Sequence, residues 1–510
     1  MNEYKARQTV IQNAECDHIE SMPMTKTQAI IIRPQRHFAL RHGWINDPNG
    51  LVWFRGRYHL YFQCNPYGNE WGKMHWGHAV SKDLIHWEEC VPSLIPDHLY
   101  ENYQRGGCFS GSVIVHKNRL YAFYTAVSMR GGQPVPAQCI AYSDDGYTFV
   151  KPAENPIIPE RPCESHDFRD PKVIFYKDRW QMIVGGSSGD AADLKSHGRI
   201  YLYHSLDLFH WNYDGILYEA PDGEGTMFEC PDLFEINGKW IITASPMNRT
   251  DFRPTVYMTG VVNFKNCLFC KEYSGTLDYG PHFYASQVYY DRYRQPVSMA
   301  WLGGWEWMPW IHDHGPSEKN GYRGILSYPR LVSLDENGRL RMKPYINAHG
   351  GKTLEENDAA SRYAEQLSRT ISRGSSAELV SSDAENTIIH LQGVIEKGKA
   401  SSAVTLSLCD EDEHRIELTM DFLFGNIIAN TTGADVWTAN GIKIFKSDIE
   451  DETVILFDLL RDGNVLEIFL FDGKYNYTSM IYPTNGRIKI LITAKGAPIR
   501  IRYSITDDIP

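Results

Sequence analysis

Turns followed by short apolar runs recur along the N-terminal part of the chain at nearly constant spacing. In each copy a Gly, Asn or Asp turn precedes a run of apolar residues, which is typical of a β-strand entered from a tight turn. The runs begin around Tyr58, Leu120, Trp180 and Trp240, which are 62, 60 and 60 residues apart, and residues 294–299 form a weaker fifth copy.

A second motif repeats with the same period. Ser81, Ser143 and Ser205 are each 62 residues apart and each begins a Ser-x-Asp sequence. About 60 residues hold four short strands with their loops, which is the size of one propeller blade. We therefore expect an all-β chain in which residues 36–345 form a five-bladed β-propeller. The alternative is a β-sandwich whose spacing arises by chance.

Alternation of apolar and polar residues dominates residues 377–510, as in residues 465–470, and Asp-Gly pairs supply hairpin turns. This pattern predicts a C-terminal antiparallel β-sandwich. The polar residues 346–376 are expected to form a linker. Residues 1–35 match neither unit and are expected to be an N-terminal extension, either a flexible tail or an ordered segment packed on a neighbouring unit.

Composition and charge limit the classes of function that the chain can have. The chain has 510 residues, which is too long for one core, with 42% hydrophobic and 13% aromatic residues. The net charge is −12 and there is no block of Lys and Arg, so a nucleic-acid partner is not expected. An uncharged sugar is compatible with this charge, and so is a homo-oligomer.

The N-terminus lacks the apolar run of a signal peptide, and no stretch reaches the roughly 18 apolar residues that span a bilayer. We therefore expect a soluble, cytoplasmic protein with no membrane partner. The ten cysteines are scattered and expected to be reduced. The lone pair Cys267 and Cys270 has no second pair for zinc, and His75 and His78 have no third ligand in register.

Three carboxylates fall at matching points of the repeat. Asp47 precedes Tyr58, Asp170 precedes Trp180 and Glu229 precedes Trp240, each by nearly the same interval along the chain. The innermost strands of a propeller line its central channel, so these acids should meet at one end of it. Clustering like charges costs free energy, and such costs usually mark function.

Two carboxyl groups flanking a glycosidic bond are the requirement for glycoside hydrolysis. Asp47, short and held on the rigid turn before Gly50, suits a nucleophile, and the longer Glu229 suits an acid/base. Asp170 would bind sugar hydroxyls and steady positive charge, with Arg169 keeping it ionised. Each acid alone has a simpler explanation, as a turn former or a surface residue, and only the shared position favours catalysis.

Aromatic residues add a weaker signal. Rings near strand ends can stack on the C–H faces of sugars, although core packing is the alternative for each ring. The candidates are Trp71, Trp76, Phe109, Trp305 and Trp307.

Several motifs resemble glycoside hydrolase family 32, which contains invertases, fructan hydrolases and sucrose-6-phosphate hydrolases. Residues 44–50 (Trp-Ile-Asn-Asp-Pro-Asn-Gly) resemble its nucleophile signature, residues 168–171 its Arg-Asp-Pro motif, and residues 229–231 its Glu-Cys motif. Further matches are Tyr61-Phe62-Gln63, Trp71-Gly72, Trp76-Gly77-His78 and Phe109-Ser110-Gly111-Ser112.

The resemblance implies a propeller plus a sandwich that hydrolyses terminal β-D-fructofuranosyl residues of sucrose and short fructo-oligosaccharides with retention. Asp47 would be the nucleophile, Glu229 the acid/base and Asp170 the transition-state stabiliser. No metal or organic cofactor is implied. The fructose pocket would be lined by Asn46, Gln63, Trp71, Phe109, Ser110, Arg169 and Trp305.

The chain departs from the family at His282, where an Asp is usual, and at Tyr328, where a Leu is usual. His282 is expected near the pocket rim, where it would affect the leaving group. Three alternatives stay open: a transfructosylase, a sucrose-6-phosphate hydrolase with the same acids, and a non-catalytic sugar-binding propeller.

Overall fold

The computed structural model describes residues 30–101, 106–162, 165–249, 253–305, 308, 315–346, 367–385, 388–483 and 486–506. These residues form β-strands and two short 3-10 helices, η1 (Leu99–Glu101) and η2 (Pro316–Asn320), without an α-helix. The all-β prediction is therefore confirmed. No helix in the described part of the chain is long and apolar enough to cross a membrane.

Five sheets occupy the N-terminal unit. The first contains β1 (Gly43–Phe54), β2 (Arg57–Asn65), β3 (His75–Ser81), β4 (Trp87–Leu94) and β18 (Tyr322–Arg323). The second contains β5 (Gly107–His116), β6 (Arg119–Arg130) and β7 (Gln133–Ser143), and the third β8 (Phe168–Tyr176), β9 (Arg179–Ser187), β10 (Gly198–Ser205) and β11 (Asn212–Glu219). The fourth contains β12 (Met227–Ile236), β13 (Lys239–Met247), β14 (Val256–Asn263) and β15 (Leu268–Thr276), and the fifth β16 (Tyr284–Tyr290), β17 (Pro296–Trp301), β19 (Arg330–Leu334) and β20 (Leu340–Pro344).

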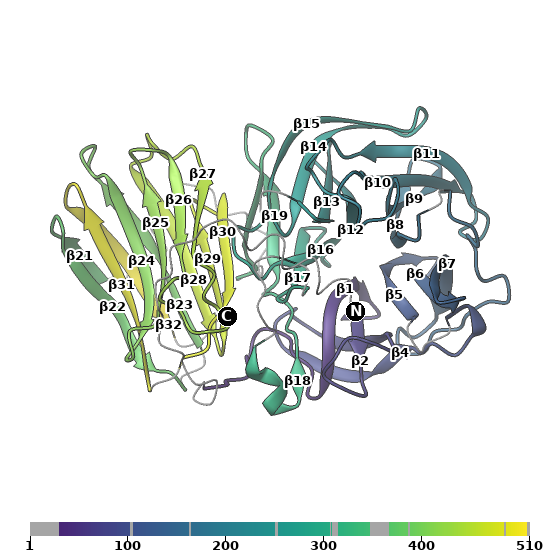
Figure 1. Ribbon diagram of the computed structural model, residues 1–510, viewed down its shortest axis with the longest axis horizontal. Coiled ribbons are helices and arrows are strands. Elements are labelled where there is room, and N and C mark those ends of the chain that lie inside the picture. Colours follow the sequence, from purple (N-terminus) through teal and green to yellow (C-terminus); the bar gives the residue numbers. More distant parts are fainter. Residues whose placement is uncertain are drawn as a thin grey trace.

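The first strands of these five sheets form a closed ring. β1 contacts β5, β5 contacts β8, β8 contacts β12, β12 contacts β16, and β16 returns to β1. Figure 1 shows the five sheets around this common centre. Side chains at equivalent positions of the five first strands are therefore brought towards one another.

The repeated Ser-x-Asp motif makes the same turn in three sheets. The Ser81 hydroxyl accepts hydrogen bonds from the Asp83 and Leu84 amides, and Asp83 accepts from two further backbone amides. Asp145 and Asp207 do the same in the second and third sheets. The motif recurs at regular spacing because, in each of these sheets, the Asp carboxylate accepts hydrogen bonds from backbone amides of the turn that follows the third strand.

Each of the five first strands is interrupted by a β-bulge at the same level. The pairing with the second strand shifts after residues 45, 108, 169, 229 and 284, so two residues in each strand leave the regular ladder. Three bulge residues have positive φ: Asp170 at 69°, Cys230 at 45° and Ala285 at 54°. A bulge re-aims side chains, and all five lie at one level of the ring.

The C-terminal unit consists of two six-stranded sheets that share one apolar core. One sheet contains β21 (Leu367–Ile371), β32 (Ile499–Thr506), β23 (Ile388–Lys397), β28 (Val454–Asp462), β29 (Val465–Leu470) and β30 (Tyr475–Met480). The other contains β22 (Ser376–Asp383), β31 (Arg487–Lys495), β24 (Ala403–Asp410), β25 (Arg415–Asp421), β26 (Asn426–Asn430) and β27 (Ile442–Lys446).

The predicted linker, residues 346–376, differs from the structure at its C-terminal end. β21 lies inside that range and pairs with β32, so it belongs to the C-terminal unit. The sequence signal is weak because four of the five β21 side chains are exposed on an edge strand. Residues 347–366 of the predicted linker lie outside the described residues.

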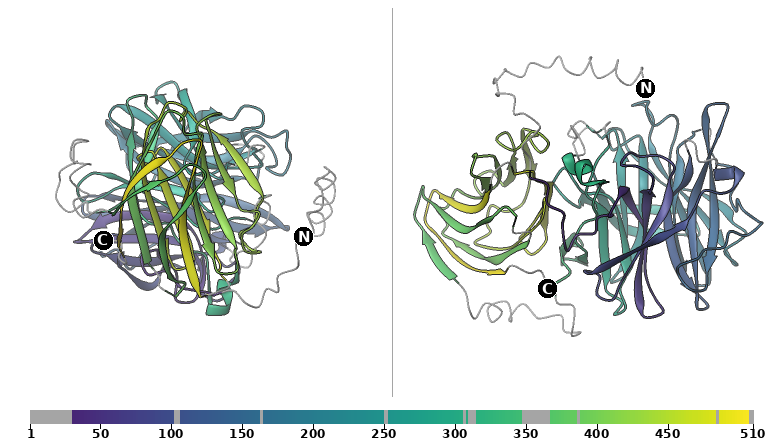
Figure 2. Two further views of the ribbon diagram at one scale, coloured as in Figure 1. Left: turned by 90° about the vertical axis from the view of Figure 1, so that its left-hand side faces the viewer. Right: turned by 90° about the horizontal axis from the view of Figure 1, so that it is seen from below.

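The predicted extension, residues 1–35, is ordered where it is described. Ile30 donates to the Pro483 carbonyl and Ile32 to the Asn464 side chain, so the segment runs along the C-terminal sheets before β1 begins (dark purple in the right view of Figure 2). Residues 1–29 lie outside the described residues.

Buried charges join the two units. The Asp462 carboxylate on β28 accepts from the backbone amides of residues 35–37 and lies 2.9 Å from Nδ1 of His37. Glu467 on β29 lies 3.5 Å from Nε2 of His37 and 3.2 Å from the guanidinium of Arg330 on β19. Arg330 also bonds Asp278 at 2.8 Å. Burial lowers the pKa of His37, but Asp462 and Glu467 raise it more, to about 9.

This junction predicts a loss of stability in mild base. The folded-state pKa of His37, about 9, exceeds the ordinary value of 6.5, so its stabilisation is complete below pH 6.5 and disappears as the pH rises through 9. The shift corresponds to about 3 kcal/mol. Urea unfolding from pH 6 to 9.5 should show this decline in the wild type and a flatter profile in His37→Gln. His414→Gln, which removes a partly buried histidine on the far unit, should keep the wild-type slope, and a parallel slope for His37→Gln would contradict the assignment.

Candidate active site

Asp47, Asp170 and Glu229 lie together at the bulges of β1, β8 and β12. Cys230, next to Glu229, connects them: its backbone amide donates to Oδ2 of Asp170 at 2.8 Å, and its thiol donates to Oδ2 of Asp47 at 3.4 Å. The three strands bring in residues that are far apart in the sequence. Three carboxyl groups therefore share one buried or half-buried region.

Asp47 is held through one oxygen. Its Oδ2 accepts a 2.6 Å hydrogen bond from the Ser110 hydroxyl, and its Oδ1 has no hydrogen-bond partner among the described residues although it is buried. Burial raises the pKa of Asp47, and the charge of Glu229 adds to the rise, while Ser110 and Asn46 oppose it. The result is a rigidly oriented carboxyl group with one uncommitted oxygen.

Asp170 has a constrained backbone. Its φ is 69°, its amide donates to the Thr125 hydroxyl at 2.9 Å, and its side chain is 4% exposed. Burial raises its pKa to about 7; Arg169 lowers this value, whereas Asp47 and Glu229 raise it. The guanidinium of Arg169 therefore favours the ionised form of Asp170, in the expected direction, while desolvation and the two neighbouring acids oppose it. The ionisation of Asp170 in the working site stays a prediction.

Glu229 uses both oxygens. Nη2 of Arg169 donates to Oε1 at 2.8 Å, and the Tyr284 hydroxyl donates to Oε2. Nη1 of Arg169 is fixed in turn by Asp167 at 2.6 Å. Arg169 therefore bonds Glu229 rather than its sequence neighbour Asp170, since successive residues of a strand point in different directions.

A buried network of side-chain amides orients Ser110, which donates a hydrogen bond to Asp47. With its side-chain oxygen facing the donors, Asn49 accepts from Gln63 Nε2 at 2.9 Å and Trp76 Nε1 at 3.0 Å, and its amide nitrogen donates to Ser110 Oγ at 3.2 Å. Ser110 is thereby oriented to donate to Asp47. Gln63 also donates to the Cys108 carbonyl at 2.8 Å, which ties the first two sheets together.

Asn46 belongs to the same region and is 2% exposed. Its Oδ1 accepts a 2.8 Å hydrogen bond from the indole of Trp44. Trp44 stacks on Trp305 with ring centroids 6.1 Å apart. Trp44, itself packed on Trp305, thus fixes the Asn46 side chain beside Asp47.

The aromatic candidates divide into two groups. Trp71 is 41% exposed and meets Phe109 and Trp305 edge-on at 5.7 and 6.4 Å, so these three rings form a partly open cluster. Trp76 is fully buried and serves the core. Trp307 lies outside the described residues.

Several residues of the site escaped the sequence prediction. Cys230 and Asn49 lie within the motifs that flag Glu229 and Asp47, but nothing in a sequence shows which backbone or thiol group meets which acid. Tyr284 lies just after His282 in a segment already singled out. Thr125 lies in a plain β-strand, so no local signal marks it.

His282 lies where the N-terminal unit meets β30 of the C-terminal unit. It is 8% exposed, and its Nδ1 accepts from the Met480 amide of β30 at 3.2 Å. Its amide also approaches the Thr478 carbonyl. The side chain thus contacts the C-terminal unit at the junction and also lines a cavity with Trp301 and Gly303, so its place at the rim of the sugar pocket stays a prediction.

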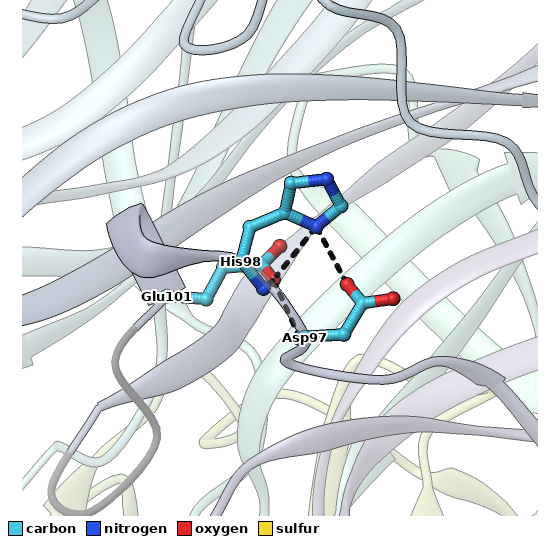
Figure 3. A group of neighbouring side chains, drawn as sticks. All are labelled: Asp97, His98 and Glu101. Carbon is cyan, nitrogen blue, oxygen red and sulfur yellow. Dashed lines mark hydrogen bonds and ion pairs between the residues drawn. The ribbon is translucent and has the colours of Figure 1, made fainter.

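One group of candidate metal ligands occurs in the described part of the chain, formed by Asp97, His98 and Glu101 (Figure 3). Nζ of Lys151 bonds Asp97 at 2.7 Å and Glu101 at 2.8 Å, so an ammonium group already pairs with both carboxylates. The other oxygen of Glu101 accepts from the Tyr124 hydroxyl at 2.6 Å. The arrangement is a satisfied structural ion pair.

The chain was compared with known proteins. Residues 37–344 match the glycosyl hydrolases family 32 N-terminal domain. A sucrose-6-phosphate hydrolase of Escherichia coli is 30% identical over 468 residues, covering 88% of this chain and 89% of that protein. A raffinose invertase of Escherichia coli is 29% identical over 467 residues, with the same coverage.

Solved structures show the same overall fold. A β-fructofuranosidase of Bombyx mori has a TM-score of 0.74 and 26% identity, covering 99% of this chain and 98% of that one. A sucrose-6-phosphate hydrolase of Lactobacillus gasseri has a TM-score of 0.75 at 23% identity, covering 94% and 95%.

The close approach of β9 to β12 predicts a sensitive glycine. A Cβ on Gly185 would lie 2.1 Å from the Phe228 carbonyl oxygen, directly before Glu229, so Gly185→Ala must displace the strand that carries this acid. Overpacking of this kind costs about 1–3 kcal/mol. Thermal unfolding should show a lower Tm and kinetics a lower kcat. Gly398→Ala, where no atom lies within 4 Å, should match the wild type; equal behaviour of the two variants would refute the proposed strand contact.

Proposed function

The chain belongs to glycoside hydrolase family 32, and we propose that it is a retaining β-fructofuranosidase acting on sucrose and short fructo-oligosaccharides. The family relatives are named as sucrose-6-phosphate hydrolases, as a raffinose invertase and as a levanase. A sucrose complex of the Bombyx mori enzyme supports sucrose as a ligand of this fold.

The observation that carries the proposal is the state of Asp47. A retaining glycosidase needs a carboxylate that is rigid, shielded from bulk water and free to form a bond through one oxygen. Asp47 has Oδ2 fixed by Ser110 and Oδ1 uncommitted within the described residues. A carboxyl oxygen in a non-catalytic sugar-binding protein can likewise accept a sugar hydroxyl. What favours catalysis is a second acid nearby: Glu229 directly precedes Cys230, whose thiol bonds Asp47.

The proposed reaction has two steps. Oδ1 of Asp47 attacks C2 of the fructosyl unit, the C2–O glycosidic bond breaks, and Glu229 gives its proton to the departing oxygen. The resulting fructosyl ester is then hydrolysed: Glu229 takes a proton from water, the water oxygen attacks C2, and the ester bond breaks to leave Asp47 ionised. Two inversions at C2 give net retention.

Asp170 is proposed to bind fructose hydroxyls and to stabilise the positive charge that develops on the ring. Arg169, bonded to Glu229, is proposed to orient the acid/base and to contact a hydroxyl. The remaining pocket is proposed to consist of Asn46, Gln63, Trp71, Phe109, Ser110 and Trp305. The half-exposed ring of Trp71 supports a place at the entrance.

The architecture that we infer is a five-bladed propeller followed by a β-sandwich. The closed ring of first strands supports the five blades, and the apolar core shared by the two six-stranded sheets supports the sandwich. We infer that the catalytic unit ends near residue 345 and that β21 opens the sandwich.

The assigned roles predict different defects. Asp47→Asn and Glu229→Gln should each lower kcat on sucrose by about 10³-fold or more, because the first removes the nucleophile and the second removes the proton donor and acceptor. Glu229→Gln should recover much of its first-step rate on β-D-fructofuranosyl fluoride, whose leaving group needs no proton, whereas Asp47→Asn should not. Asp178→Asn, an exposed control, should behave as wild type. Wild-type turnover of sucrose by either active-site variant would refute the proposal.

Sucrose-6-phosphate hydrolysis is the second candidate, favoured by the name of the 30% identical Escherichia coli relative. The same carboxylates serve both substrates, so the acids do not separate them. Transfructosylation also uses the same ester, with a sugar replacing water. Measured kcat/KM values for sucrose, sucrose-6-phosphate and kestose, with product analysis, distinguish the three.

A further inference from the structure

A buried hydroxyl–amide pair holds the backbone of Asp170 from the neighbouring sheet. Thr125 on β6 and Gln138 on β7 are both fully buried. The Thr125 hydroxyl donates to Oε1 of Gln138 at 2.8 Å and accepts from the Asp170 amide at 2.9 Å. Nε2 of Gln138 donates to the Phe168 carbonyl at 3.2 Å. The pair therefore hydrogen-bonds the backbone on both sides of Arg169, at Phe168 and at Asp170.

The position of Thr125 recurs in the repeat. Gln63, Thr125, Gly185 and Ser245 follow one another at the repeat spacing, each on the second strand of its sheet. Gln63 donates to the Cys108 carbonyl and Ser245 accepts from the Ala285 amide, so these side chains bond the first strand of the following sheet near its bulge.

Gly185 is the exception among these four residues, because it has no side chain, and this affects how Asp170 is held. Without a side chain at this position, no second-strand group is available to the Cys230 amide, which instead donates to Oδ2 of Asp170. Asp170 is thus fixed twice: its amide by Thr125 and its carboxylate by Cys230. The two bonds determine the direction in which the side chain leaves a backbone with φ of 69°.

We propose that Thr125, oriented by Gln138, is a positioning residue that aims the Asp170 carboxylate at the fructosyl ring. The assignment rests on the proposed function, because it takes Asp170 to contact the substrate. A positive φ at a non-glycine residue is strained and persists only where the surrounding structure supports it. The Thr125 hydroxyl supplies that support without touching the sugar.

The test compares Thr125→Val, which keeps the shape and removes the hydroxyl, with Thr125→Ser, which keeps the hydroxyl. Thr125→Val should lower kcat on sucrose by about tenfold to 100-fold, as a small misplacement of a catalytic group does, with KM changed by less than about threefold. Thr125→Ser should stay within about threefold of wild type. The control Thr405→Val breaks a 2.8 Å hydroxyl pair with Thr419 in the C-terminal unit and should leave kcat unchanged.

An Asp170→Asn background separates this proposal from the proposed function. If Asp170→Asn lowers kcat but leaves a measurable residual rate, and Thr125→Val costs nothing further in that background, Thr125 acts through Asp170; a further loss of the same size as in the wild type overturns the positioning role. A wild-type kcat in Thr125→Val with an inactive Asp170→Asn overturns the positioning role alone, whereas a fully active Asp170→Asn overturns the function of Asp170 itself. If Thr125→Val does not fold, Gln138→Met replaces it, because it removes the amide that orients Thr125. Its kcat should fall by the same factor, and a wild-type kcat would overturn the positioning role.

Discussion

The bulge at one level of all five first strands is the constraint on which the site depends. A regular strand would alternate its side chains between two faces, and neighbouring acids would point apart. The register shifts at residues 45, 108, 169, 229 and 284 instead turn groups from five sheets towards one region. In the second sheet this delivers the Ser110 hydroxyl, and in the first, third and fourth sheets it delivers Asp47, Asp170 and Glu229. The closed ring of strands then fixes their mutual distances, so the rigidity of the site is a property of the whole N-terminal unit.

Bringing three carboxyl groups together costs electrostatic free energy, and the three groups have different hydrogen-bond partners that offset it. Burial raises the pKa of both Asp47 and Asp170. The charge of Glu229 raises it further at Asp47, and the charges of Asp47 and Glu229 raise it further at Asp170. Hydrogen bonds oppose this cost: Ser110 and the Cys230 thiol serve Asp47, the Cys230 amide serves Asp170, and Arg169 with Tyr284 serves Glu229. The guanidinium of Arg169 thus pairs with the acid proposed to exchange protons. One uncommitted oxygen, Oδ1 of Asp47, remains where a covalent bond to the sugar is proposed.

The sequence reveals this arrangement only in part. The repeat locates the three acids because the turns before Tyr58, Trp180 and Trp240, and the apolar runs that begin there, are local signals that recur in the sheet of each acid. Asp170 lies slightly closer to its landmark Trp180 than Glu229 does to Trp240, and the bulge explains this difference: Asp170 is equivalent to Cys230, which directly follows Glu229. The partners of Arg169, the position of His282 at the junction and the role of Thr125 were not accessible, because each depends on contacts between sheets that are distant in the sequence. A repeat shows which positions are equivalent, but it does not show which neighbour a side chain bonds.

The stereochemistry of fructosyl transfer tests the central claim most directly. If Oδ1 of Asp47 forms a fructosyl ester that a second nucleophile then displaces, methanol added to the reaction with sucrose competes with water for that ester. NMR of the early products should then show methyl β-D-fructofuranoside, with the configuration of the substrate retained. Methyl α-D-fructofuranoside as the first-formed product would mean a single displacement without an ester on Asp47, and would contradict the account.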